Sequence, residues 1–222
     1  MITSSLLQSV PGIVHGFGTA AELVPHALAG AWAVRPGKKQ VHGTQLAEVT
    51  AANQECGDAD GIFSAEAGIP ISVITADCVP LILARRDGAM VAAIHAGWRG
   101  LIGGIIDTFA ECLKEKGEAP TDWVAAVGPT VGACCYEVSG ELAAQFVSHF
   151  HWLPTETVSP RHRHLELNAI AEAELRRIGI GDVDNLKLCT MCRRNAEGNF
   201  LFRSYRRGDR GPQLHSGAMI LP

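Results

Sequence analysis

The chain has 222 residues, of which 47% are hydrophobic and 19% are charged. This composition excludes a disordered chain. The formal net charge of −4 at pH 7 excludes a nucleic-acid binder that works through bulk positive charge. The length fits one globular domain or two tightly fused halves, and we expect a single domain over residues 1–222. A domain of this size buries roughly 70% of its unfolded surface.

The location of the protein is predicted from its apolar runs and its cysteines. No apolar stretch is long enough to cross a membrane, and no secretory leader is recognised at the start. The seven cysteines are an odd number in a chain too large to need disulfides for stability. We therefore expect a cytoplasmic protein with free thiols, away from membranes and nucleic acids.

The hydrophobic pattern predicts the following elements in chain order. Helices are expected near residues 20–28, from the glycine-rich turn after residue 95 to about Gly117, at 139–150 with Ser139 as N-cap, and at 167–178. Gly37–Lys39 is expected to be a turn. Strands are expected at 71–75, 79–84, 90–95, 123–127, 186–189, 200–205 and 218–221. Grouped strands with a few helices between them indicate an α+β fold with mixed sheets.

Three segments place reactive side chains at strand ends beside tight glycine turns. They are QVHG at 40–43, TADC at 75–78 and HAGWRG at 95–100. The separations between their histidines and cysteine are too long for a zinc finger but suit a catalytic zinc site with one open position for water. Zinc would lower the pKa of that water to about 7. Spacing alone favours a plainer interpretation, a small buried thiol and two hydrogen-bonded core histidines.

Other segments carry possible ligand contacts. The N–H groups of the turn at 97–100 could hold an anion, with Arg99 adding a bidentate contact, or Arg99 is simply solvated. The loop 128–137 either brings Cys135 near a ligand or is a turn with buried thiols. Arg206 is one of four arginines around Tyr205, which either close over an anionic substrate or form a solvated basic strand.

Two further motifs allow either a purely structural or a functional interpretation. The turn at 58–61 offers an aspartate for acid–base chemistry or for support of a metal ligand, or it is an ordinary Asp-Gly turn. Cys189 and Cys192 form a single CxxC, which without a second pair is weak evidence for zinc. We interpret this CxxC as structural or incidental.

Taken together, these segments resemble the YfiH-like, or laccase-domain, family. The resemblance covers roughly residues 10–221 and rests on QVHG at 40–43, TADCVPLIL at 75–83, HAGWRG at 95–100, GPTVGACCYEV at 128–138, CT at 189–190 and SYRR at 204–207. The motifs match in order and spacing, and together they overturn the plainer interpretation of the histidines and cysteine.

The resemblance implies an α/β/β/α arrangement of mixed sheets and a zinc site made of His42, Cys78 and His95, at which Cu2+ could also bind. It implies phosphorolysis of adenosine, inosine and methylthioadenosine, and deamination of adenosine. The fold is shared with a deamidating bacterial toxin that uses a Cys–His pair. The candidate catalytic residues are Cys78, His95 and Arg99, and the candidate substrate-binding residues are Arg99, Cys135 and Arg206.

The sequence departs from the family pattern in two places. Family members usually continue HGF with F-T-R-x-G-G, whereas here Phe17 is followed by Gly18-Thr19-Ala20. The usual T-G-R near the C-terminus is replaced by Arg210-Gly211-Pro212. The first departure removes an arginine and a glycine pair that could contact substrate or phosphate.

Three other functions compete with a purine nucleoside enzyme. A hydrolase of peptidoglycan precursors is one, because some bacterial relatives are implicated in peptidoglycan editing. The copper polyphenol oxidase of the older family name is another, but a laccase of that kind needs an H-C-H, which this chain lacks. A non-catalytic partner protein would have no use for an open metal position. The oligomeric state is left open.

Overall fold

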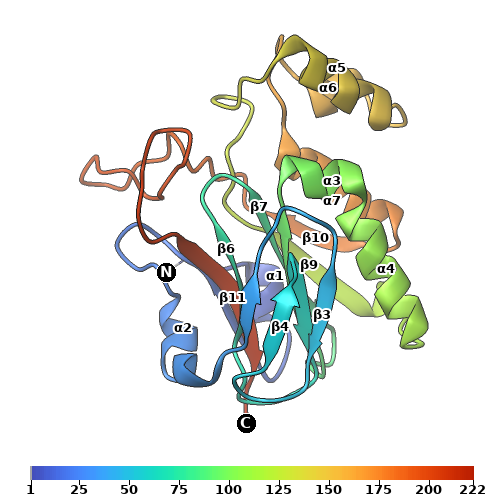
Figure 1. The fold of residues 1–222 in the computed structure, drawn as a ribbon, viewed down its shortest axis with the longest axis vertical. Helices are drawn as coiled ribbons and strands as arrows, with labels where there is room; N and C mark the ends of the chain where they lie inside the picture. Colours follow the sequence, from blue (N-terminus) through green and yellow to red (C-terminus); the bar gives the residue numbers. More distant parts are fainter. Residues whose placement is uncertain (1) are drawn as a thin grey trace.

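Two β-sheets packed face to face form the centre of the molecule, and helices cover their outer faces (Figure 1). The structure is a computed structural model and describes residues 2–222. Its layered α+β arrangement with mixed sheets is the predicted fold class. No helix in these residues is long and apolar enough to cross a membrane.

The larger sheet has six strands in the order β10-β9-β7-β8-β5-β3, parallel at its two ends and antiparallel between them. The smaller sheet is antiparallel with the order β1-β11-β6, and β2 pairs with β4 beside them. The strands are β1 Ile13–Phe17, β2 Gly37–Lys39, β3 Leu46–Val49, β4 Glu55–Asp58, β5 Gly61–Ser64, β6 Ile71–Thr75, β7 Val79–Arg85, β8 Val91–Ala96, β9 Trp123–Val127, β10 Asp182–Asn185 and β11 Leu214–Ile220.

Strand β7 shows why the central strands read as unbroken apolar runs. Successive side chains of a strand point to opposite faces of its sheet. Leu81 and Leu83 therefore pack under the helices, whereas Ile82 and Ala84 pack against the smaller sheet. Because both faces are buried, both sets of side chains must be apolar.

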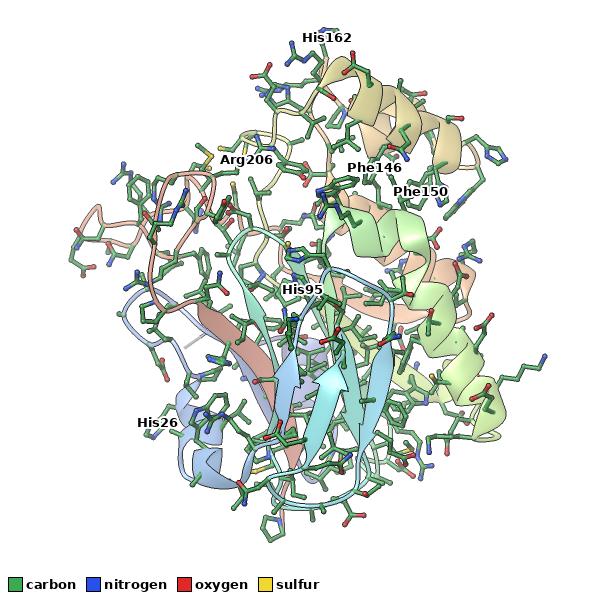
Figure 2. The ribbon with its side chains drawn as sticks, in the orientation of Figure 1. His26, His95, Phe146, Phe150, His162 and Arg206 are labelled. Carbon is green, nitrogen blue, oxygen red and sulfur yellow. The ribbon has the colours of Figure 1, made fainter. Side chains whose placement is uncertain are left out.

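The helices are distributed over the two outer faces. Helices α3, α4 and α7 cover the larger sheet, and α5 and α6 extend that layer past the strand ends. Phe146 of α5 and Phe150, which follows the helix as its C-cap, point into this layer (Figures 1 and 2). Helix α2 packs against β1 on the outer side of the smaller sheet, and α1 lies near β9. The helices are α1 Ser5–Gln8, α2 His26–Ala29, α3 Trp98–Gly103, α4 Ile105–Glu115, α5 Gly140–His149, α6 Thr155–Val158 and α7 Leu167–Arg177, with 3-10 turns at Trp32–Val34 and Pro120–Asp122.

Most of the predicted elements are confirmed within a few residues, and Ser139 caps α5 by accepting a hydrogen bond from the Leu142 N–H. The helix expected up to Gly117 is divided at Gly104, whose φ of 83° ends α3 before α4 begins. The helix near 20–28 is shorter than expected, and α2 begins only at His26.

Three predicted elements are wrong. The expected turn at 37–39 is strand β2, because it pairs with β4. The strand expected at 186–189 lies earlier, as β10, where it pairs with β9. Residues 200–205 form no strand beyond the single bridge of Phe200 to Arg194. The chain bends there because the Ser204 hydroxyl donates to the carboxylate of Asp77 and the Ser204 N–H donates to Asp209.

Strand β1 holds a buried histidine that links stability to pH. His15 is 4% exposed, and its Nε2 accepts a hydrogen bond from the Ser4 N–H at 2.9 Å. Burial lowers the pKa of His15 from 6.5 to about 4, against a smaller opposing effect of Asp184. The unfolded chain therefore takes up this proton near pH 6.5, whereas the folded protein does so only near pH 4.

We predict that this difference weakens the fold as the pH falls from 6.5 towards 4. Between pH 7 and pH 5 His15 should lower the free energy of unfolding by about 2 kcal/mol. His15→Gln keeps an acceptor for the Ser4 N–H but cannot be protonated in this pH range. The free energy of unfolding of this variant should therefore fall by about 2 kcal/mol less between pH 7 and pH 5 than that of the wild type. Urea unfolding of both proteins at the two pH values checks this. Equal losses would contradict the assignment to His15.

Candidate metal centre and its cavity

One buried aspartate positions both histidines of the predicted site. Strand β5 pairs with β8 so that Asp60, which precedes β5, lies beside His95 near the end of β8. The carboxylate of Asp60 is fully buried and lies 2.7 Å from His95 Nδ1. It also accepts hydrogen bonds from the backbone N–H groups of residues 41, 42 and 43, at 2.8–3.0 Å. A single carboxylate therefore orients His95 and shapes the loop that carries His42.

A second buried aspartate positions the cysteine. Asp77 lies in the turn between β6 and β7 with a φ of 97°, a conformation that costs a non-glycine residue roughly 1–3 kcal/mol. Its carboxylate accepts hydrogen bonds from the Thr190 and Ser204 hydroxyls and from the Arg206 N–H, at 2.6–3.0 Å. These bonds hold the turn in place and so determine where the next residue, Cys78, points.

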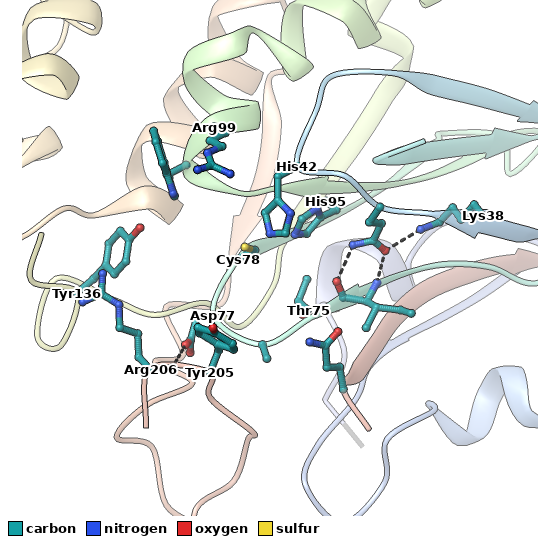
Figure 3. A pocket seen from close by; sticks show the side chains of 15 residues that line it. Lys38, His42, Thr75, Asp77, Cys78, His95, Arg99, Tyr136, Tyr205 and Arg206 are labelled. Atoms are coloured by element: carbon teal, nitrogen blue, oxygen red, sulfur yellow. Dashed lines mark hydrogen bonds between the residues drawn. The ribbon is translucent and has the colours of Figure 1, made fainter. Parts of the chain in front are cut away.

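The three predicted metal ligands meet in space. The ligand atoms of His42, Cys78 and His95 all lie within 4.8 Å of one another (Figure 3). His95 is buried among the strand ends near the middle of the molecule (Figure 2), whereas His42 is exposed. Because Nδ1 of His95 bonds to Asp60, Nε2 is the nitrogen left to bind a metal, and a carboxylate behind a ligating histidine raises its basicity.

The charges around the triad suit a cation. Burial raises the pKa of the Cys78 thiol to about 12, and the carboxylates of Asp77 and Asp60 act in the same direction. Burial lowers the pKa of His42, aided by neighbouring His95, so this imidazole is neutral at pH 7. Burial alone would raise the pKa of Asp60, but its hydrogen bonds from His95 and the loop hold it below its ordinary value. A thiolate here needs a cation beside it, and a neutral imidazole can bind one.

The donor set and the space between the donors both fit a divalent ion. Two imidazole nitrogens and one sulfur are ligands that zinc accepts, and they leave a fourth position open. Gly97 borders this space, because a Cβ atom there would lie 3.2 Å from both Cys78 Sγ and His42 Cδ2. The absence of a side chain at Gly97 thus keeps a cradle clear beside the three ligands.

The triad borders a cavity of about 750 Å³, a volume typical of small-molecule sites. Arg99 and Trp98 flank it from α3, and Arg206, Tyr136 and Tyr205 line the side opposite Lys38 (Figure 3). Lys38 Nζ donates to Gln40 Oε1 at 2.6 Å, and burial lowers the pKa of Lys38 to about 8. The cavity therefore combines the candidate metal ligands with cationic and aromatic walls.

The other predicted site residues divide into two groups. Arg99 and Arg206 line the cavity, and the Arg206 guanidinium lies 4.7 Å from the centre of the Tyr136 ring. Cys135 is not among the lining residues, although its neighbour Tyr136 is. It belongs instead to a second group of thiols, which we call the four-cysteine cluster: Cys134, Cys135, Cys189 and Cys192.

The sequence-based interpretation missed several residues of the site. The 58–61 turn predicts an aspartate that supports a metal ligand, and Asp60 is placed to do this. The sequence pattern does not reveal the role of the Asp77 carboxylate, because its partners lie 113 or more residues away in the chain. Lys38 and Gln213 belong to none of the sequence motifs, so no local signal identifies them as cavity residues.

Comparison with known proteins gives a family match over most of the chain. The family model described as multi-copper polyphenol oxidoreductase laccase matches residues 26–220. A curated relative from Streptomyces coelicolor, named purine nucleoside phosphorylase SCO2081, is 34% identical over 74% of this chain and 67% of its own length. Purine nucleoside phosphorylase YfiH of Escherichia coli is 30% identical over 76% of this chain and 67% of its own length.

Solved structures with the same fold extend the match. YlmD from Geobacillus stearothermophilus superposes with a TM-score of 0.79 at 23% identity, over 96% of this chain and 94% of that one. The Neisseria meningitidis protein NMB0706 superposes with a TM-score of 0.74 at 27% identity, over 88% of this chain and 78% of that one.

The cradle beside Gly97 can be tested directly. Gly97→Ala should fold normally, since its φ of −71° suits alanine. The added Cβ would force Cys78 and His42 apart by a few tenths of an ångström, and we expect zinc affinity to fall at least about tenfold. Gly140→Ala, which has no atom within 4 Å of its added Cβ, is the matched control. Competition with a chromogenic chelator measures the zinc affinity of each variant. Equal affinities of Gly97→Ala and Gly140→Ala would contradict this role of Gly97.

Proposed function

The chain belongs to the family described as multi-copper polyphenol oxidoreductase laccase, and from that premise we propose that it is a metal-dependent purine nucleoside phosphorylase. The observation that carries the proposal is the convergence of His42, Cys78 and His95 at a cavity lined by arginines and aromatic rings. The names of the curated relatives support the same reaction class. Because their alignments span about two thirds of those relatives, the activity of this chain is our proposal.

Phosphorolysis requires that a phosphate dianion be held against the ribose carbon that carries the base. Arg99 offers a guanidinium on the cavity wall, where it stacks 5.0 Å from the Trp98 ring centre. A planar guanidinium binds phosphate through two parallel hydrogen bonds. We assign Arg99 to bind phosphate, with Lys38 supplying a second positive charge from the other side of the cavity.

The purine and ribose need a partly apolar site, and the other wall supplies one. Tyr136 and Tyr205 border the cavity, and Arg206 lies against Tyr136. Arg206 is itself fixed, because its Nη1 donates to the Glu137 carbonyl at 2.5 Å and its N–H donates to Asp77. A fixed guanidinium and aromatic rings can stack on a planar base at little entropic cost.

The metal is part of the proposal. His42, Cys78 and His95 would hold zinc, and a zinc ion acts as a Lewis acid that polarises oxygen atoms of a bound substrate. The same ligands can bind Cu2+, which outcompetes zinc at most nitrogen and sulfur sites. The chain's own contribution is to hold the ligands in place through Asp60 and to keep the fourth position open to the cavity.

The finer parts of the proposal concern substrates and setting. We propose adenosine, inosine and methylthioadenosine as substrates for phosphorolysis, and adenosine also for deamination. One domain, 1–222, would carry the whole site. Its seven thiols are all free of disulfides in the structure, which suits the reducing cytoplasm.

The reaction can be followed from its products. Adenosine incubated with the zinc-loaded protein should yield adenine only when phosphate is present, and any inosine would establish deamination. Cys78→Ala should lower both rates by more than about 100-fold and remove one metal equivalent per chain, because it deletes a ligand. Cys112→Ala, whose thiol lies in α4, should behave as wild type.

Two results would contradict the proposal. Unchanged adenosine in both conditions would exclude these activities for this chain. A Cys78→Ala protein that keeps its full metal content would exclude the assigned ligand set.

The phosphate contact gives a separate prediction. Arg99→Gln should raise the KM for phosphate about tenfold or more, because one charge-assisted contact is lost, while the KM for adenosine changes less. Arg86→Gln, which breaks an exposed ion pair with Asp182, is the control. Initial rates at varied phosphate and adenosine separate the two constants, and parallel changes in both would argue against a phosphate role for Arg99.

A further inference from the structure

The four-cysteine cluster lies outside the cavity, and the proposed function does not use it. Cys134 and Cys135 come from the loop after β9, and Cys189 and Cys192 from the turns after β10. All four Sγ atoms lie within 4.8 Å of one another. Two segments more than 50 residues apart in the chain thus each bring two thiols to one place.

The backbone holds these two segments together independently of the sulfurs. The Thr130 N–H donates to the Leu188 carbonyl, and the Thr190 N–H donates to the Thr130 carbonyl, both at 3.0 Å. The Gly132 N–H donates to Cys189 Sγ at 3.4 Å. Backbone N–H groups directed at a sulfur stabilise it as a thiolate, which is the form that binds metals.

The distances match a metal site better than a disulfide. Zinc binds thiolates at about 2.3 Å in a tetrahedron, so neighbouring sulfurs lie about 3.8 Å apart. Cys134 Sγ and Cys192 Sγ are 3.7 Å apart. A disulfide would bring its two sulfurs to about 2.05 Å.

The surrounding charges also suit a metal bound by four thiolates, which carries two net negative charges with a divalent ion. Arg207 Nη1 donates to the carbonyls of Met191 and Thr190, between the two cysteines of the CxxC, at 2.8 and 3.2 Å. Arg161 Nη2 donates to the Cys134 carbonyl at 3.4 Å. Two guanidinium groups therefore lie beside the cluster, of which that of Arg207 also pairs with the carboxylate of Asp209.

We propose that the four-cysteine cluster binds one structural zinc ion. Four sulfur ligands in a tetrahedral arrangement select zinc or iron, and the protein supplies all four, so no position is left for a substrate. This differs from the triad, which has three ligands and borders the cavity. The proposal does not depend on the proposed function.

Such an ion would brace one wall of the cavity. Cys135 precedes Tyr136, which lines the cavity. Cys189 precedes Thr190, whose hydroxyl donates to the carboxylate of Asp77 at 2.6 Å. The zinc would therefore join the loop that carries Tyr136 to the segment that anchors the turn before Cys78.

The test separates the two sites by using Cys78→Ala as the starting protein. This variant, purified with a reductant and without chelator, should retain one zinc per chain by elemental analysis. Cys78→Ala/Cys192→Ser should retain none, whereas Cys78→Ala/Cys112→Ser, which alters a thiol outside both groups, should retain one. Circular dichroism confirms that each variant is folded.

A second measurement does not rely on the cluster variants. Cobalt substituted into Cys78→Ala should show the intense visible bands and the sulfur-to-metal charge transfer of tetrahedral thiolate coordination. The proposal would be overturned if Cys78→Ala is purified without any metal and its six remaining thiols all react in the native state. One equivalent of iron in place of zinc would also overturn it, as would an intact mass lowered by two hydrogens for each disulfide.

Discussion

The buried carboxylate of Asp60 is the interaction on which the candidate metal centre depends. It is fully removed from solvent, and it satisfies its oxygens with His95 Nδ1 and three consecutive backbone N–H groups. A buried charge without such partners costs several kcal/mol, so any rearrangement of these partners is opposed. The same bonds that keep Asp60 ionised hold His42, at a φ of 60°, opposite His95.

The buried carboxylate of Asp77 fixes the position of Cys78, as that of Asp60 fixes the positions of the two histidines. The strained backbone of Asp77 persists because its carboxylate and carbonyl oxygens bond to three other segments of the chain. One of those segments carries Arg206, and another carries the CxxC. The cavity wall, the position of Cys78 and the four-cysteine cluster are therefore coupled through this one residue, and disturbance of any of them should be felt at the others.

The two groups of candidate metal ligands differ in a way that follows from their surroundings. The triad is built at the ends of strands, faces a cavity and keeps a position open beside Gly97. The four-cysteine cluster is built from loops and supplies four sulfurs from the protein alone. Catalytic zinc sites keep an open position and structural sites are closed. The geometry therefore favours a catalytic role for the triad and a structural role for the four-cysteine cluster.

How much could be predicted from the sequence depends on how local each feature is. The apolar runs of β6, β7 and β8 and the cap at Ser139 are local patterns, and the structure confirms them. The strand predicted at 200–205 is wrong because long-range bonds to Asp77 outweigh the local preference. The sequence alone determined the chemistry of the ligands, since residue type fixes which atoms can bind a metal. Only the tertiary structure decided that Cys135 joins Cys189 and Cys192, because strand register and buried hydrogen bonds bring distant segments together.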